Sequence, residues 1–293
     1  MKHIVSFSGG RTSAYLVHLM EERKKRENLE IEYVFMDTGA EHPKTYDFIK
    51  ECVNYFGIDL TVLKIEINPT LGEANTFSQC GVDDIRWDLS RFKKMVAKYG
   101  NPYNPGGGYC TDQMKTQTFK RYVKEKARLY KFYANIDFEF VSWIGIRVDE
   151  KTRLKQKNNV KYLAHISQMD KDDIIGWWSE MPFDLETPEF SGNCAFCIKK
   201  SSSRIAIAQK ESPELYYEWN EMIKNANPKE REFPIDAIYR GKLSFDGIAS
   251  LYADHSIDEI KRTLRRSKRQ DAGCGSNSCE IDFEQFDMFK ENK

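Results

Sequence analysis

The feature that most constrains the fold lies directly after the first apolar residues of the chain. Ile4-Val5 lead into Ser6-Phe7-Ser8-Gly9-Gly10-Arg11-Thr12-Ser13, which is typical of a strand, a glycine turn and a helix start. Glycine lets the backbone turn tightly because it has no Cβ, and N–H groups at a helix start favour an anion. The segment therefore predicts a site for a nucleotide phosphate. An ordinary strand–turn–helix connection is the alternative, and the pattern is not that of a Walker A loop.

Strands alternate with helices in the first part of the chain. Apolar periodicity predicts strands at 2–7, 31–36 and 60–67, and helices at 11–28 and 43–56. This order implies parallel strands with right-handed crossovers, so we expect an α/β, doubly wound, mostly parallel sheet. Beyond a less regular stretch, the sequence predicts a helix at 111–130, a strand at 138–146 and a last helix at 257–269.

The chain length allows two regions. We expect a nucleotide-binding α/β domain at 1–165 and a helical, cysteine-containing C-terminal region at 166–293. Lys plus Arg and Asp plus Glu each number 45, so bulk charge gives no evidence for a polyanionic partner. No apolar run approaches the ~20 residues of a membrane span. Seven cysteines without a recognisable secretory signal indicate a reducing compartment, so we expect a cytoplasmic protein with no membrane partner. The oligomeric state is not predicted.

Two further polar segments follow predicted strands. Asp37-Thr38-Gly39 ends the second strand, and Gly145-Ile146-Arg147 ends the strand at 138–146. In doubly wound sheets, ligands bind at the carboxyl ends of the strands. We therefore expect both segments to meet the glycine turn at one crevice.

Four segments, taken in order, resemble those of a known family. They are Ser6 to Ser13, the run from Val34 through Asp37-Thr38-Gly39 to Thr45-Tyr46, Cys110-Thr111 with Lys115, and Gly145-Ile146-Arg147 with Glu150 and Arg153. Together they resemble the PP-loop (adenine nucleotide α-hydrolase) superfamily, and within it the phosphoadenosine phosphosulfate (PAPS) reductase-like branch. The resemblance covers roughly residues 2–200.

The resemblance implies roles for individual residues. Ser6, Ser8, Gly9, Gly10, Arg11, Thr12, Ser13, Asp37, Thr38, Gly39 and Gly145 would bind the nucleotide. Asp37 would lie near adenine or ribose, and the Arg11 guanidinium is a candidate for bidentate phosphate binding. Lys115, Arg147 and Arg153 would neutralise phosphates or a pyrophosphate leaving group. Asp149 and Glu150 would orient these arginines or bind Mg²⁺. For each charged residue the alternative is a surface salt bridge.

The cysteines predict a metal site. Cys194-Ala-Phe-Cys197 has the spacing at which two thiolates reach one metal ion, and the resemblance adds Cys110. A fourth ligand would come from Cys274 or Cys279, with Cys80 also available. We prefer a [4Fe–4S] cluster, with zinc as the alternative. In a second arrangement Cys194, Cys197, Cys274 and Cys279 bind zinc and Cys110 is free to act as a nucleophile.

Three functions remain open. The first is an ATP pyrophosphatase that adenylates a substrate, with Mg²⁺, and passes sulfur to a nucleic acid or a small molecule. Residues 261–269, with six basic residues and no acid, would contact the nucleic acid, although such a run is more often a solvated helix face. The second is a sulfonucleotide (PAPS or APS) reductase with a thioredoxin-like partner, but the Glu-Cys-Gly-Leu-His segment of that family is missing. The third is a non-catalytic nucleotide-binding accessory protein.

Overall fold

A single six-stranded sheet organises the residues described by the structure, a computed structural model that covers 1–100, 110–187, 194–225, 239–240 and 243–270. For 266–270 only the backbone is described. The strand order is β4-β3-β2-β1-β5-β6, and every neighbouring pair is parallel except β3 and β4. The strands are β1 (Lys2–Ser6), β2 (Ile31–Asp37), β3 (Leu60–Glu66), β4 (Thr76–Cys80), β5 (Phe140–Ile144) and β6 (Val160–Tyr162). The predicted α/β class with a mostly parallel sheet is confirmed.

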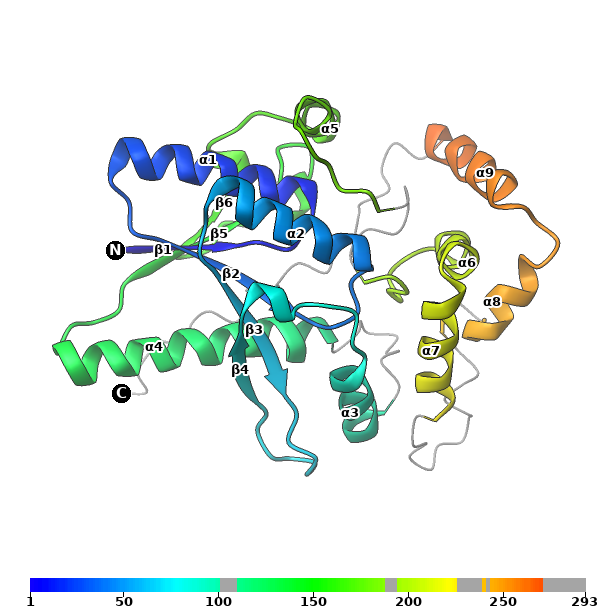
Figure 1. The fold of residues 1–293 in the computed structure, drawn as a ribbon, viewed down its shortest axis with the longest axis horizontal. Coiled ribbons are helices and arrows are strands. Elements are labelled where there is room, and N and C mark those ends of the chain that lie inside the picture. The colour runs from blue at the N-terminus through cyan, green and yellow to red at the C-terminus, as the bar shows by residue number, and fades with distance from the viewer. Residues whose placement is uncertain (101–109, 188–193, 226–238, 241–242, 271–293) are drawn as a thin grey trace.

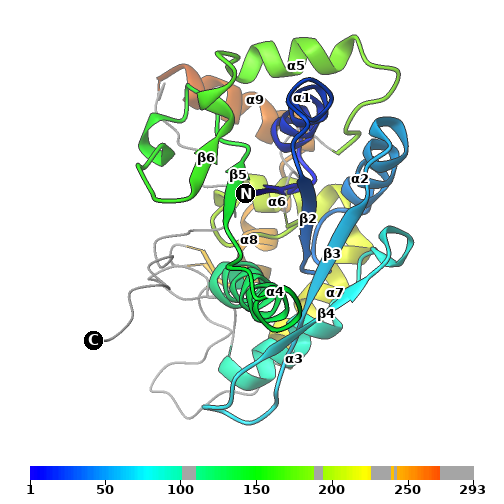
Figure 2. The same ribbon diagram turned by 90° about the vertical axis from the view of Figure 1, so that its left-hand side faces the viewer.

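Helices cover both faces of the sheet. Figures 1 and 2 show α1 (Arg11–Glu27) and α2 (Pro43–Phe56) on one face and α4 (Thr118–Ala134) on the other, with α5 (Lys171–Ser179) outside α1. Figure 1 shows the later helices beyond the end of the sheet toward which β1 runs: α6 (Ser202–Glu211), α7 (Pro213–Lys224), α8 (Phe245–Leu251) and α9 (Ile257–Gln270). In the part of the chain that the structure describes, no helix has the length and apolar character needed to cross a membrane.

Side chains of alternate strand residues build two separate cores. In β2, Tyr33 and Phe35 pack with α1 and α2, whereas Val34 and Met36 pack with α4. Successive side chains of a strand point to opposite faces, so a strand covered on both faces is apolar throughout. A third core joins the C-terminal helices to the segment around Phe196.

Several elements differ from those predicted. The stretch expected to be irregular contains β4 and α3 (Ser90–Tyr99), and residues 154–163, whose polar and basic sequence predicts a linker, contain β6. The expected helix at 111–130 is a π-helix, η2 (Thr111–Gln117), continued by α4. Short single-turn helices are η1 (Val82–Asp84), η3 (Lys151–Arg153) and η4 (Leu163–His165). The missed strands are short edge strands, whose exposed backbone and polar side chains give little periodicity.

The direction in which successive strands are added to the sheet reverses next to β1. From β1 the chain moves outward through β2 and β3, and then returns to place β5 on the other side of β1. Ser6 is in register with Ile144, so β1 and β5 end at the same level. Such a reversal separates the loops that follow the two strands and leaves a crevice between them.

Candidate functional site

A pocket of about 200 Å³ lies at this reversal point. Three parts of the chain line it: the turn before α1 and its first residues, the loop after β5, and α5 with the segment that follows it. The lining residues are Ser8, Gly10, Arg11, Thr12, Ser13, Gly145, Arg147, Glu150, Arg153, Lys171, Ile174, Ile175 and Leu185. The structure thus brings together most residues of two predicted segments, at the place where doubly wound sheets bind ligands.

The turn before α1 is held by one hydroxyl. Ser13 Oγ accepts hydrogen bonds from the backbone N–H groups of Ser8 at 3.1 Å and Gly10 at 3.3 Å, and donates to Gly10 O at 2.9 Å. Gly9 has φ +77°, and a Cβ there would lie 2.8 Å from Ile49 Cδ1. The turn is therefore tied to both α1 and α2. The first-turn N–H groups of a helix lack intrahelical partners, so this end of the pocket is suited to an anion.

Gly145 allows the loop after β5 to reach the start of α1. A Cβ at this position would lie 2.9 Å from Ser13 Cα and 3.1 Å from Ser13 N. The backbones therefore touch here, and the pocket has one wall from each side of the strand reversal.

Two arginines of the pocket are oriented by neighbouring carboxylates. Arg147 binds both carboxylate oxygens of Asp149 at 2.9 Å and donates to Thr12 Oγ1 at 3.0 Å. Glu150 accepts from Arg153 Nη1 at 2.5 Å and from the Arg147 N–H at 3.1 Å. The hydrogen bonds from Arg147 lower the pKa of Asp149 despite partial burial. Of the two roles expected for Asp149 and Glu150, this geometry favours orientation of the arginines over Mg²⁺ binding.

Arg11 has a different partner from the one expected. Its guanidinium binds both oxygens of Asp184 at 2.7 and 2.9 Å and donates to Leu185 O at 2.8 Å. The predicted bidentate contact with phosphate is therefore taken up by a carboxylate of this chain. Because Leu185 lines the pocket, this contact joins the segment after α5 to the first residue of α1.

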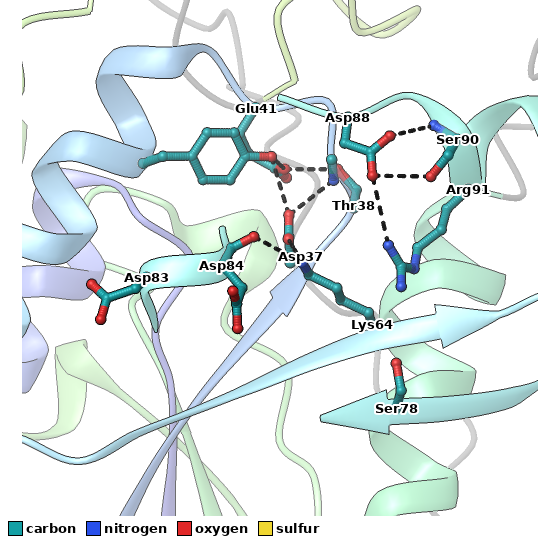
Figure 3. Close-up of polar contacts among 12 residues, drawn as sticks. Asp37, Thr38, Glu41, Lys64, Ser78, Asp83, Asp84, Asp88, Ser90 and Arg91 are labelled. Carbon is teal, nitrogen blue, oxygen red and sulfur yellow. Dashed lines mark hydrogen bonds and ion pairs between the residues drawn. The ribbon is translucent and has the colours of Figure 1, made fainter. Parts of the chain in front are cut away.

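Asp37 lies in a buried polar cluster rather than in the pocket lining. Figure 3 shows it between Thr38 and Lys64 at the end of β2. Its carboxylate accepts from Gly39 N at 2.9 Å and Tyr46 OH at 3.1 Å, and pairs with Lys64 Nζ at 3.3 Å. Burial, followed by the nearby carboxylate of Glu41, raises the pKa of Asp37. Asp37, Thr38 and Gly39 are thus separate from the pocket-lining residues, and so is Ser6 in β1.

Glu41 is the residue of this cluster that the sequence analysis missed. Its side chain is 1% exposed and accepts from Thr38 Oγ1 at 2.8 Å and Tyr46 OH at 3.0 Å. The Lys115 ammonium lies 3.4 Å away, and Cys194 Sγ lies 3.9 Å away. One buried carboxylate therefore joins three predicted segments. The sequence feature that could have identified Glu41 is its position, because it is an acidic residue just beyond the end of a buried strand.

The Cys194 turn is attached to the end of β2 by backbone pairing. Cys194 forms an isolated antiparallel bridge with Glu41, and Ala195 N donates to Ala40 O at 2.9 Å. Cys197 N donates to Cys194 O at 3.3 Å, which closes the turn between the paired cysteines.

Three predicted cysteines belong to the core that contains Tyr239. Cys110 precedes η2 and is partly buried. Tyr239 is fully buried, and its pKa is raised by burial, then by Cys197, with Cys110 and Cys194 adding to the effect. Within the described ranges, no three His, Cys, Asp or Glu side chains are grouped to hold a metal ion. Cys274 and Cys279, the other predicted ligands, lie outside the described residues.

The basic helix predicted near the C-terminus is α9. Its start is capped, because Ser256 Oγ accepts from Glu259 N at 3.2 Å and the Glu259 carboxylate accepts from Ser256 N at 2.8 Å. Lys261 pairs with Glu211 at 2.6 Å, whereas Arg262 and Arg265 are exposed. The side chains of 266–270 lie outside the description.

Comparisons with known proteins give the family. The sequence model of the phosphoadenosine phosphosulfate reductase domain matches residues 2–180. An uncharacterized nin region protein, ORF290, of Escherichia phage lambda is 44% identical over 293 residues, which is 98% of each chain. An uncharacterized Methanocaldococcus jannaschii protein is 22% identical over 75% of this chain and 41% of its own length. A phosphoadenosine 5'-phosphosulfate reductase of Thiocapsa roseopersicina is 33% identical over 73 residues, 25% of this chain and 29% of its own. The chain therefore belongs to the phosphoadenosine phosphosulfate reductase-like family of PP-loop proteins.

Proposed function

We propose that the pocket between β1 and β5 binds ATP and that the protein is an ATP pyrophosphatase coupled to sulfur transfer. One observation carries the proposal: the first turn of α1 and the oriented side chains of Arg147 and Arg153 line one pocket. A helix N-terminus and two fixed guanidinium groups are suited to neighbouring phosphates.

In the proposed reaction a substrate oxygen attacks the α-phosphorus of ATP. The bond from that phosphorus to the bridging oxygen breaks, pyrophosphate leaves with the electron pair, and the substrate becomes adenylated. Arg147 and Arg153 stabilise the charge that develops on the leaving group. A sulfur nucleophile then displaces AMP. Mg²⁺ would enter with ATP and neutralise part of its charge. The acceptor is a small molecule or a nucleic acid, for which the exposed Arg262 and Arg265 of α9 provide phosphate contacts.

The partial similarity to a PAPS reductase supports a second candidate, sulfonucleotide reduction. The same pocket would bind the phosphates of PAPS or APS, and a thioredoxin-like protein would supply the electrons for the reduction. A binding protein without turnover is the third candidate.

Incubation with ATP, and separately with PAPS or APS plus thioredoxin, distinguishes these candidates. We expect pyrophosphate release from ATP, and an Arg147→Gln variant to release it at least about 100-fold more slowly, because a charge-stabilising donor is lost. Arg128→Gln, on the exposed side of α4, is the control and should keep full activity. Sulfite release without pyrophosphate would favour the reductase, and nucleotide binding without either product would favour the binding protein.

We further propose that Cys110, Cys194 and Cys197, with Cys274 or Cys279, hold a [4Fe–4S] cluster, with zinc as the alternative. The chemistry of the donors fits, since Cys194 and Cys197 belong to one turn and, with Cys110, to the core that contains Tyr239. Thiolates are ligands for both groups. The described residues supply no complete ligand set, so the fourth ligand comes from the rest of the chain.

Metal analysis of anaerobically purified protein tests this proposal. We expect a brown protein with about four iron atoms per chain and charge-transfer absorption in the visible range. Cys197→Ser is expected to lose the iron, whereas Cys52→Ala should keep it, because Cys52 is buried in α2 among apolar side chains. One zinc atom without iron would establish the alternative, and neither metal would contradict both.

A further inference from the structure

Four cationic side chains line the pocket, and three of them have carboxylate partners. Arg11 is bound by Asp184, Arg147 by Asp149, and Arg153 by Glu150. Lys171 is the fourth, and it forms no ion pair or hydrogen bond with any residue that the structure describes. The arginines are therefore held in place before a ligand arrives, whereas the Lys171 ammonium has no carboxylate partner among the described residues and can pair with an anionic ligand.

The backbone of Lys171 is nevertheless firmly placed. It is the first residue of α5, whose start is capped by Asp170 accepting from the N–H groups of Asp172 at 2.8 Å and Asp173 at 3.0 Å. The other end of α5 is anchored on α1, because the fully buried Trp178 donates from Nε1 to Arg11 O at 3.0 Å. A fixed Cα with a flexible, exposed side chain can follow a ligand group at the mouth of the pocket.

The pocket runs from a buried end to an exposed one. Ser13 and Gly145, which line it, are buried, whereas Lys171 is exposed. A phosphate bound at the first turn of α1 would lie at the buried end, beside Ser13. The phosphates that follow it would then extend toward the exposed end and Lys171.

We infer that Lys171 binds the outer phosphates of the nucleotide and makes the pocket select a polyphosphate over a monophosphate. The inference rests on the proposed nucleotide site and adds a specificity residue to it. The ammonium is a compact point charge with three donors, which suits a terminal phosphate that is solvated and free to rotate. The apolar side chains of Ile174 and Ile175, one turn further along α5, line the same pocket beside it.

Calorimetric titration of the full chain with ATP and with AMP tests the inference. Lys171→Gln is expected to weaken ATP binding by about tenfold, because a charge-assisted contact is lost. AMP binding should change by less than about twofold, since it lacks the outer phosphates. Lys171→Arg should keep most of the ATP affinity, because its charge remains. The matched control is Lys161→Gln, an exposed lysine of β6 that does not line the pocket.

The result separates the inference from the proposed function. Equal loss of ATP and AMP affinity in Lys171→Gln, or no loss of either, would overturn the inference while wild-type ATP binding sustains the nucleotide site. Failure of the wild-type chain to bind both nucleotides would overturn the proposed function itself. Because Lys171 is exposed, the melting temperature of the variant should equal that of the wild type, and a fall of several degrees with parallel loss of both affinities would also count against the inference.

Discussion

A Gly145→Val variant is expected to lose nucleotide binding by at least about 100-fold, since a valine cannot occupy the contact between the two pocket walls. The new Cβ would lie 2.9 Å from Ser13 Cα and 3.1 Å from Ser13 N, and these backbone atoms cannot swing aside as a side chain can. The start of α1 must therefore move away from the end of β5, which pulls the first-turn N–H groups from Arg147. Titration with ATP measures the loss.

Gly176→Ala is the matched control for this prediction. Gly176 lies in α5, and a Cβ there would meet nothing within 4 Å. Alanine in a helix is favoured over glycine by about 0.5–1 kcal/mol, so this variant should bind ATP normally and be slightly more stable. Wild-type affinity in Gly145→Val would show that the close approach of the two walls does not form the site.

Removal of the Glu41 carboxylate is expected to be the most destabilising single change in the polar cluster. Glu41 is 1% exposed and Lys115 is 9% exposed, so Glu41→Ala leaves a buried ammonium without this partner. Breaking a buried ion pair from one side typically costs about 3–5 kcal/mol. Thr38 loses the same acceptor, and Tyr46 loses one of its two. Chemical denaturation followed by far-UV circular dichroism gives the free energy of unfolding.

An exposed pair of the same residue types provides the comparison. Lys44 and Glu186 approach more closely, at 2.9 Å, but their side chains are 48% and 72% exposed. Glu186→Ala is expected to cost less than about 1 kcal/mol, because water screens the pair. A Glu41→Ala/Lys115→Met double variant should recover part of the lost stability, since neither charge is then stranded. Equal losses in Glu41→Ala and Glu186→Ala would contradict the structural importance of Glu41.

Local patterns in the sequence were enough to predict the central elements of the fold. The helix predicted at 43–56 has the same bounds in the structure. Pro43 suits a first helical turn, and Gly57 takes the left-handed conformation that terminates a helix. Strands with two buried faces were also visible as apolar runs. β4 and β6 were missed because an edge strand needs only one partner and few apolar residues.

The candidate site was predictable only where its contacts are local. Arg147 and Asp149 stand two residues apart, so their association followed from spacing. Arg11 and Asp184 are separated by 173 residues, and Glu41 and Cys194 by 153. Nothing in the neighbourhood of either residue indicates such a partner. Both pairings result from the packing of later segments of the chain against the end of the sheet, and only the Glu41–Cys194 pair is buried.

The backbone bridge between Glu41 and Cys194 couples the end of β2 to the turn between Cys194 and Cys197, here called the cysteine turn. Thermodynamic linkage then imposes reciprocity on whatever binds at the two places. If occupancy of the cysteine turn alters the affinity for nucleotide by some factor, the nucleotide must alter the affinity of the cysteine turn for its own ligand by the same factor. A titration performed from either side therefore reports on both.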